Sequence, residues 1–203
     1  MSMSESGPCM SLDAALHALA RRRRDQVVVA TMTAMAPWRK IAATDRDIGC
    51  VGFMGGASTL GLGIALARPD VPVWIIDGDG SLTMQLGSLM TIANAAPRRF
   101  LHVVMRNGVY DTSGAQPILG AGTVSFAALA EAAGYARGVR FEDAESFDAA
   151  LDELIEVDGP VLVELITQPT GAGYVTPPPA TSKSRHVLAM TWPVLRDALR
   201  REA

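Results

Sequence analysis

The sequence predicts an α/β fold in which a parallel sheet forms the middle layer and helices cover both of its faces. The apolar runs that predict strands do not alternate with polar residues, which is typical of strands buried on both faces. Segments with helical periodicity separate these runs, and such alternation joins parallel strands. The chain has 203 residues, 49% of them hydrophobic and 19% charged, which indicates one globular domain with a sizeable core.

Each predicted strand is a short apolar run, and each predicted helix has apolar residues three or four positions apart. The strands are expected at residues 26–31, 72–77, 100–105, 137–141 and 161–166. The helices are expected at residues 10–24, 34–43, 59–67, 125–133, 146–156 and about 192–202. Pro37 weakens the helix expected at residues 34–43. Gly134 is placed to end the helix expected at residues 125–133. One further helix begins after Gly80 and ends before Pro97. Its expected apolar face consists of Leu82, Leu86, Leu89, Met90 and Ala93.

A single domain is expected over residues 10–167, with a flexible leader at residues 1–9. Residues 49–58 (GCVGFMGGAS) predict a glycine-rich turn. The remaining segment, 168–203, is a tail that is rich in Pro, Thr and Ser up to residue 184. The helix near its end either docks back onto the domain or contacts a partner.

The composition argues against two classes of partner. The formal net charge is −3, which does not favour nucleic-acid binding. We interpret the basic run Arg21–Arg24 as a helix end, where cations face the negative end of the helix dipole. Every apolar run is interrupted before it reaches membrane-spanning length. Cys9 and Cys50 form no CxxC pair, and the N-terminus carries no secretory signal pattern. We therefore expect a cytoplasmic protein that binds neither nucleic acid nor a membrane.

Polar residues follow two of the predicted strands at the point where each strand ends. Asp79 follows residues 72–77 and Asn107 follows residues 100–105, with one helix and one strand between them. Because a βαβ crossover returns the chain to the same edge of a sheet, the two side-chain oxygens can converge. With a backbone carbonyl nearby they suit Mg²⁺, which takes its remaining ligands from phosphate and water.

Small residues beside Asp79 extend this interpretation to a diphosphate site. Gly78 and Gly80 let the backbone approach a phosphate, and Ser81 adds a hydroxyl group. The amides after Gly80 open a helix, whose N-terminus favours an anion. The alternative is that GDG and Asn-Gly form ordinary turns, and spacing alone leaves both interpretations open.

Taken together, these motifs resemble the cofactor motif of enzymes that depend on thiamine diphosphate (ThDP). In that family GDG is followed after roughly 25 to 30 residues by Asn, as GDGS at 78–81 is followed here by Asn107. GFMG at 52–55 resembles the segment that contacts the aminopyrimidine ring. NGVYDTSGAQP (107–117) and ALARPD (65–70) resemble sulfopyruvate and phosphonopyruvate decarboxylases.

The resemblance implies a role for individual residues around the diphosphate. Asp79 and Asn107 would bind Mg²⁺ through side-chain oxygens, and Val109 would bind it through its backbone carbonyl. Gly80 and Ser81, with the neighbouring Gly78, would hold the diphosphate.

Two further residues are implied to contact the rings of the cofactor. The carbonyl of Gly52 would accept a hydrogen bond from the 4′-amino group, and Met54 would be the apolar wedge that bends the cofactor. The alternative for Met54 is that it fills the core, as methionine often does.

The chain also departs from the family. Many relatives have Asn where this chain has Arg106, which either pairs with the diphosphate or an acidic substrate, or points outward as a surface residue. Thr112 and Gln116 either meet the substrate or cap the loop. In the family a Glu from a separate pyrimidine-binding domain activates the cofactor, whereas we interpret Glu164 as structural. A partner subunit is therefore expected to supply that Glu.

The resemblance implies a diphosphate-binding (PP-type) domain that binds ThDP and Mg²⁺. It implies a subunit of a 2-oxo acid decarboxylase, a lyase acting on a small acidic substrate of the sulfopyruvate or phosphonopyruvate type. The subunit is expected to be inactive without an α-type, pyrimidine-binding partner, in a hetero-oligomer or a homodimer. Two alternatives stay open: an acyloin-forming lyase subunit, and a cofactor-binding module without catalysis.

Other chemically reactive residues give weaker signals. His17 and His102 lie away from the strand ends and are expected in the core or on the surface, while His186 lies in the tail. Cys50 has no evident activating base, and Ser58 is not part of a GxSxG elbow.

Overall fold

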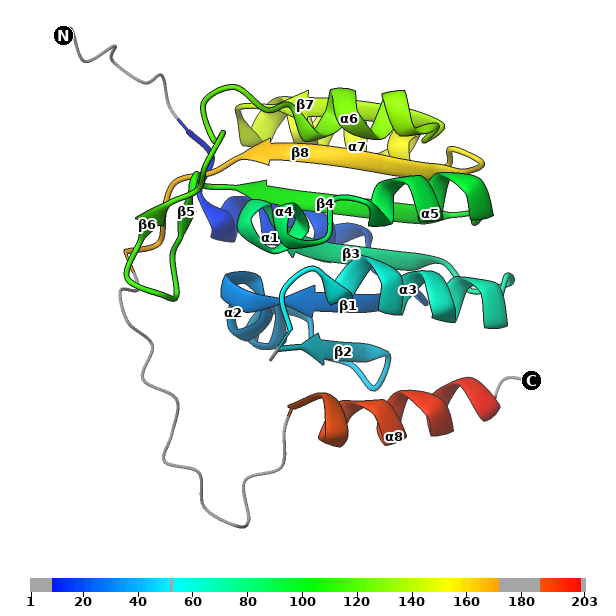
Figure 1. Cartoon of the computed structure of the whole chain (residues 1–203). Coiled ribbons are helices and arrows are strands. Elements are labelled where there is room, and N and C mark those ends of the chain that lie inside the picture. Colours follow the sequence, from blue (N-terminus) through cyan, green and yellow to red (C-terminus); the bar gives the residue numbers. More distant parts are fainter. Residues whose placement is uncertain (1–8, 52, 172–186, 202–203) are drawn as a thin grey trace, which may run out of the picture.

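The computed structural model describes residues 9–51, 53–171 and 187–201, and its centre is a six-stranded parallel sheet (Figure 1). The strand order is β2-β1-β3-β4-β8-β7, and each neighbouring pair is parallel. These strands are β1 (Val27–Thr31), β2 (Asp47–Cys50), β3 (Val73–Gly78), β4 (Phe100–Arg106), β7 (Arg137–Phe141) and β8 (Pro160–Ile166). The predicted fold class is confirmed, and the carboxyl ends of all six strands lie at one edge.

Two helical layers cover the sheet. One layer contains α1 (Leu12–Arg22), α2 (Met32–Ala42) and α7 (Ala144–Ile155). The other contains α3 (Gly56–Ala67), α4 (Asp79–Met84), α5 (Ser88–Ala95) and α6 (Phe126–Ala133). Successive residues of β1 alternate between the layers, since Val27 and Val29 pack with α3 whereas Val28 and Ala30 pack with α1. Because both faces are buried, the strand is apolar at every position except the last, Thr31.

The last helix, α8 (Val187–Arg200), lies beside the edge strand β2 (Figure 1). Its Leu195 and Ala198 are buried, and Leu195 joins the same core as α3. The helix therefore docks back onto the domain and covers one sheet edge. Residues 1–8 and 172–186 lie outside the described residues, so the expected leader and most of the expected extended tail are not tested. None of the helices in the described part of the chain is long and apolar enough to cross a membrane.

Two local predictions were wrong. Gly49 and Cys50, expected in a turn, are the last residues of β2, a strand too short to stand out as an apolar run. The single helix expected after Gly80 is two helices, α4 and α5, because the chain turns between them before Ser88. Leu86 and Met90 are consequently 36% and 69% exposed instead of lying on one buried face.

The loop after β4 and the helix that follows it determine one side of the site. Within the loop, β5 (Val109–Tyr110) and β6 (Gln116–Pro117) pair as a short antiparallel hairpin. The hydroxyl of Ser125 then accepts the N–H of Ala128 and caps α6. Gly134 ends α6 at a φ of 106°, as predicted.

The basic run at the end of α1 takes part in specific ion pairs. Arg22 binds Asp152 of α7 at 3.0 Å and also pairs with Asp148, which Arg21 binds at 2.7 Å. Arg23 binds Asp47 of β2 at 2.7 Å. The run thus ties α1 to α7 and to the sheet edge, which is more than the helix-dipole role expected for it.

Candidate functional site

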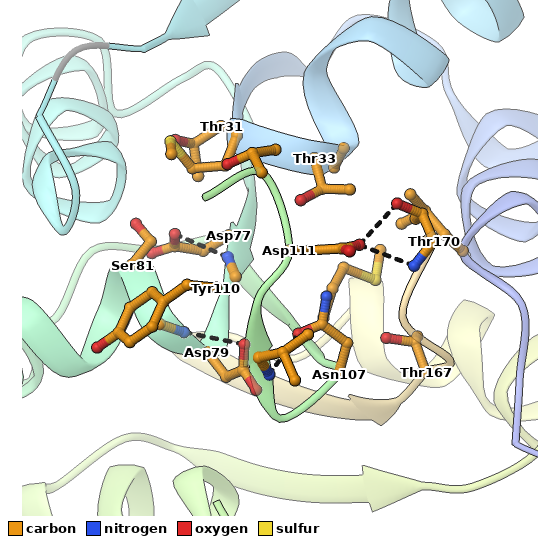
Figure 2. A pocket seen from close by; sticks show the side chains of 18 of the residues that line it. Thr31, Thr33, Asp77, Asp79, Ser81, Asn107, Tyr110, Asp111, Thr167 and Thr170 are labelled. Atoms are coloured by element: carbon orange, nitrogen blue, oxygen red, sulfur yellow. Dashed lines mark hydrogen bonds between the residues drawn. The ribbon is translucent and has the colours of Figure 1, made fainter. Parts of the chain in front are cut away.

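The carboxyl ends of β1, β3 and β4 border one pocket (Figure 2). This is the edge at which open parallel sheets bind ligands. The polar residues that line it include Thr31, Thr33, Asp77, Asp79, Ser81, Asn107, Tyr110, Asp111, Thr167 and Thr170. The carboxylates of Asp77, Asp79 and Asp111 thus line one pocket. Because their negative charge would repel an anionic ligand, such a ligand would need a cation beside it.

Asp79 lies at the start of α4 and is 3% exposed. Its Oδ1 accepts the N–H of Gly80 at 2.9 Å, and its Oδ2 accepts the N–H of Gly108 at 2.7 Å. The second bond joins the loop after β3 to the loop after β4. Burial raises the pKa of the Asp79 carboxyl above its ordinary value, against the opposing effects of these N–H groups and of the Arg106 charge.

Asn107 follows β4 and lines the same pocket, as does Val109. Its Oδ1 accepts the N–H of Val109 at 3.0 Å, which folds the chain tightly after the strand. The structure therefore brings Asp79 and Asn107 to one pocket, as the strand-end argument predicted, and Val109, which the resemblance alone indicated, lines the same pocket. Their oxygens are hard ligands, and a carboxylate with two neutral oxygens fits Mg²⁺ that completes its shell with phosphate and water. No cluster of three His, Cys, Asp or Glu side chains suited to a metal occurs among the described residues.

The glycines beside Asp79 differ in their surroundings. A Cβ atom on Gly78 would meet nothing within 4 Å, so this backbone faces open space in the pocket wall. A Cβ atom on Gly80 would lie 2.7 Å from the ring of Tyr110, so Gly80 permits close packing of the β5–β6 hairpin. The hydroxyl of Ser81 accepts the N–H of Gly55 at 2.9 Å and ties the glycine-rich turn to the site.

The start of α2 adds a feature that the sequence analysis missed. The hydroxyl of Thr31 donates to the carbonyl of Cys50 at 2.6 Å and does not cap the helix. Met32, Thr33 and Ala34 line the pocket, so the N-terminus of this 11-residue helix faces it. Backbone N–H groups at a helix N-terminus favour an anion, which suits a diphosphate beside the cation ligands.

The two residues expected at the rings of a cofactor have different outcomes. Met54 lines the pocket and is half-buried, with Leu12 and Met105 on the same lining. Gly52 lies outside the described residues.

Asp77, which the sequence analysis did not select, is a second acid at this edge. Its side chain is fully buried, its Oδ1 accepts the N–H of Gly78 at 2.9 Å, and its Oδ2 lies 3.5 Å from Nε2 of His102. The other ring nitrogen of His102 lies 3.4 Å from the hydroxyl of Tyr135, whose pKa is raised by burial and by Asp77. His102 is therefore a core residue, as expected, but it contacts an acid of the pocket wall.

Asp111 is the third acid, and its signal in the sequence was only its place in the loop after Asn107. It is 3% exposed, and its Oδ2 accepts both the N–H of Thr170 at 2.7 Å and the hydroxyl of Thr170 at 2.6 Å (Figure 2). Its Oδ1 is buried without a hydrogen-bond partner among the described residues. Thr112 also lines the pocket, whereas Gln116 is exposed on β6.

The interpretation of Arg106 as an outward-pointing surface residue was wrong, while its pairing with a diphosphate or an acidic substrate stays a prediction. Arg106 is 9% exposed and forms an ion pair of 2.6 Å with Glu164, because the end of β4 lies beside β8. Glu164 is fully buried and is structural, as expected.

The weaker candidates stay outside the chemistry. Burial and the nearby Asp77 raise the pKa of Cys50 to about 11, so its thiol is not activated. Ser58 is buried and donates to Ser88 at 3.3 Å. His17 is exposed on α1, and His186 lies outside the described residues.

Comparison with known proteins identifies this arrangement. The family profile of the thiamine pyrophosphate enzyme C-terminal TPP-binding domain matches residues 26–165. The chain belongs to this family. It is 40% identical over 153 residues to phosphonopyruvate decarboxylase of Streptomyces viridochromogenes, covering 74% of this chain and 38% of that one. It is 36% identical over 132 residues to the sulfopyruvate decarboxylase β subunit of Methanothermobacter thermautotrophicus, covering 65% of this chain and 68% of that one.

Solved structures agree on the fold of this TPP-binding domain. The ThDP-dependent 4-hydroxybenzoylformate decarboxylase of Rhodococcus jostii RHA1 superposes with a TM-score of 0.68 at 20% identity, over 84% of this chain and 35% of that one. A ThDP-dependent enzyme of Mycobacterium smegmatis has a TM-score of 0.67 at 22% identity, over 79% of this chain and 32% of that one. The chain thus spans about a third of these enzymes and little more than a third of the phosphonopyruvate decarboxylase.

Proposed function

We propose that this TPP-binding domain holds Mg²⁺ and ThDP as one subunit of a decarboxylase for a small acidic 2-oxo acid. The observation that carries the proposal is the hydrogen bond from Gly108 to Asp79, which brings Asp79, Asn107 and Val109 to one pocket. The names of the relatives, phosphonopyruvate and sulfopyruvate decarboxylase, support the substrate class.

In this proposal the residues of the chain bind and orient the cofactor. Asp79, Asn107 and the carbonyl of Val109 would hold Mg²⁺, whose charge would offset that of a diphosphate beside the acidic pocket wall. Gly78, Gly80, Ser81 and the N-terminus of α2 receive the diphosphate oxygens. Met54 would contact the ring system, and the same role expected for the carbonyl of Gly52 falls on a residue outside the described part of the chain. When bound, ThDP would supply the electron sink that stabilises the negative charge left when a 2-oxo acid loses carbon dioxide.

A partner subunit completes the site in this proposal. Glu164, a buried glutamate near the site, is committed to Arg106 and to the start of α6. The Glu that activates the cofactor would therefore come from a pyrimidine-binding α-type subunit, and the chain alone would be inactive. A relative is itself named a β subunit, which supports a hetero-oligomer. We place the assembly in the cytoplasm.

The first experiment is calorimetric titration of Mg²⁺–ThDP into the purified chain, with and without metal. We expect saturable, Mg²⁺-dependent binding that Asp79→Ala weakens by about 100-fold or more, because a ligand is lost. Asp158→Ala, which removes an exposed carboxylate from an ion pair with Arg98, is the matched control and should bind normally. Equal affinity in the wild type and in Asp79→Ala would refute the metal assignment.

A second experiment addresses the partner and the reaction. The chain is mixed with a candidate pyrimidine-binding subunit and sulfopyruvate or phosphonopyruvate, and products are analysed with and without an acceptor aldehyde. Release of an aldehyde in both cases supports the decarboxylase. A coupled product that needs the acceptor would instead indicate an acyloin-forming lyase, and cofactor binding without turnover would indicate a non-catalytic module.

A further inference from the structure

Arg106 bridges the two ends of the loop that borders the candidate site, which spans residues 107–124. It is the last residue of β4 and directly precedes Asn107. Its Nη1 donates to Oε1 of Glu164 at 2.6 Å, and its Nη2 donates to the carbonyl oxygen of Ala121. The residue before the loop is therefore hydrogen-bonded to a residue close to the end of the same loop.

Glu164 binds both Arg106 and the start of α6. Its side chain is fully buried in β8, and its Oε2 accepts the N–H of Ala127 at 3.1 Å and the hydroxyl of Ser125 at 3.2 Å. Both donors belong to the start of α6, where the loop ends. One carboxylate thus neutralises Arg106 and fixes the helix to which the loop leads.

The loop held in this way supplies much of the pocket wall. Val109, Tyr110 and Asp111 line the pocket together with Asp79. Tyr110 and Ile118 lie so close to Gly80 that a Cβ atom there would be 2.7 Å from the Tyr110 ring and 3.1 Å from Ile118. The position of the loop therefore decides where the carbonyl of Val109 lies relative to the Asp79 carboxylate.

We propose that Arg106 is a positioning residue, which with Glu164 and Ala121 staples loop 107–124 over the site and thereby sets the affinity for Mg²⁺–ThDP. The part that concerns the cofactor rests on the function proposed above. Arg106 does not line the pocket itself, since its donors are committed to Glu164 and Ala121. Its hydrogen bonds act on the ligand through the loop, while its charge also favours the ionised form of Asp79.

The test compares substitutions of Arg106 with a matched pair elsewhere on the chain. Arg106→Met keeps an unbranched side chain but removes its hydrogen-bond donors. Arg106→Lys keeps the positive charge beside Glu164 but lacks the guanidinium geometry that reaches Glu164 and Ala121 together. Arg98→Met is the control, because Arg98 pairs with Asp158 at 2.7 Å on the exposed surface before β4. The double variant Arg106→Met/Glu164→Gln tests whether the two residues act as one unit.

Two measurements are made on each variant. The first is the dissociation constant of Mg²⁺–ThDP by calorimetry, under conditions where circular dichroism shows a folded chain. We expect Arg106→Met to weaken binding by about 10- to 100-fold, the usual effect of losing a residue that supports a metal ligand. Arg106→Lys should be intermediate, the double variant no weaker than Arg106→Met, and Arg98→Met within about twofold of the wild type.

The second measurement is amide hydrogen exchange in the ligand-free chain. Faster exchange confined to residues 107–124 in Arg106→Met, with β3 and β4 still protected, supports a staple on the loop. Faster exchange throughout the sheet, or binding as tight as in the wild type, would overturn the proposal. If the wild type fails to bind Mg²⁺–ThDP even with a pyrimidine-binding partner present, the proposed function fails, and exchange in the loop still decides whether Arg106 staples it. Should Arg106→Met fail to fold, Arg106→Lys gives the same two readouts.

Discussion

Asp79 accepts the backbone N–H of Gly108 at 2.7 Å and so joins the loops that follow β3 and β4. This single bond connects two segments that are 29 positions apart in the sequence. It also aligns the Asp79 carboxylate with the turn that starts at Asn107. The carboxylate is nevertheless buried, and burial outweighs its hydrogen bonds, so that its pKa is raised.

The raised pKa of Asp79 predicts opposite pH dependences for folding and for cation binding. In the ligand-free chain the protonated form is favoured on folding. The contribution of Asp79 to stability is therefore greatest below the ordinary aspartate pKa of 3.8 and is lost as the pH rises through the raised value. Mg²⁺ needs the ionised form, so its affinity should fall on acidification at a higher pH than for an exposed aspartate.

The measurement is denaturant unfolding at several pH values above 3.8, with and without Mg²⁺–ThDP. Asp79→Asn is the comparison protein, because its side chain at position 79 cannot titrate. Exposed groups with a lowered pKa, such as Asp70, are present in both proteins, so their pH dependence cancels in the difference. We expect the ligand-free wild type to lose stability relative to Asp79→Asn as the pH rises. If the difference in free energy of unfolding between the wild type and Asp79→Asn stayed constant with pH, this would contradict a raised pKa for Asp79.

The sheet was predictable because strands buried on both faces are apolar at most positions. Val27–Thr31 and Phe100–Arg106 are such strands, and their boundaries in the structure differ little from those expected. The edge strand β2 escaped prediction because four residues, one of them glycine, give no pattern. The break between α4 and α5 escaped because Leu86 and Met90 fit a helical face, although tertiary packing leaves them exposed.

Without the family resemblance, the site was predictable only as far as strand ends reveal it. Asp79 and Asn107 follow strands, and sheet topology alone brings them together. The contact between Asp111 and Thr170 joins residues 59 positions apart through loops, which no periodicity encodes. Arg106 and Glu164 were likewise separate features of the sequence, and only the pairing of β4 with β8 makes them partners.

Gly80 should tolerate no side chain, although its backbone needs no left-handed conformation. In Gly80→Ala the new Cβ atom would lie 2.7 Å from the Tyr110 ring, so the β5–β6 hairpin must shift. We expect a loss of about 1–3 kcal/mol in the free energy of unfolding, which is typical of overpacking. The affinity for Mg²⁺–ThDP should fall as well, because the hairpin carries Val109.

Gly63→Ala is the matched control for this substitution. Gly63 lies within α3, and its Cβ atom would meet nothing within 4 Å. Because alanine favours a helix over glycine, stability should rise by about 0.5–1 kcal/mol with cofactor affinity unchanged. Urea unfolding and calorimetry measure both quantities. If Gly80→Ala and Gly63→Ala had equal effects on stability and on cofactor affinity, the close contact of Gly80 with Tyr110 would contribute to neither.

Asp111 and Thr170 should behave as one energetic unit that fastens the segment after β8 to the pocket hairpin. Oδ2 of Asp111 accepts two hydrogen bonds from Thr170, and the carboxylate is 3% exposed. Asp111→Ala removes both bonds, and should lower the free energy of unfolding by about 2 kcal/mol, whereas Thr170→Val removes only the hydroxyl bond and should cost about 1 kcal/mol. Urea unfolding of both variants and of the double variant gives the coupling between them. If the two losses in the free energy of unfolding simply added, the bonds would not be shared, whereas a loss in the double variant smaller than their sum is the result that the shared bonds predict.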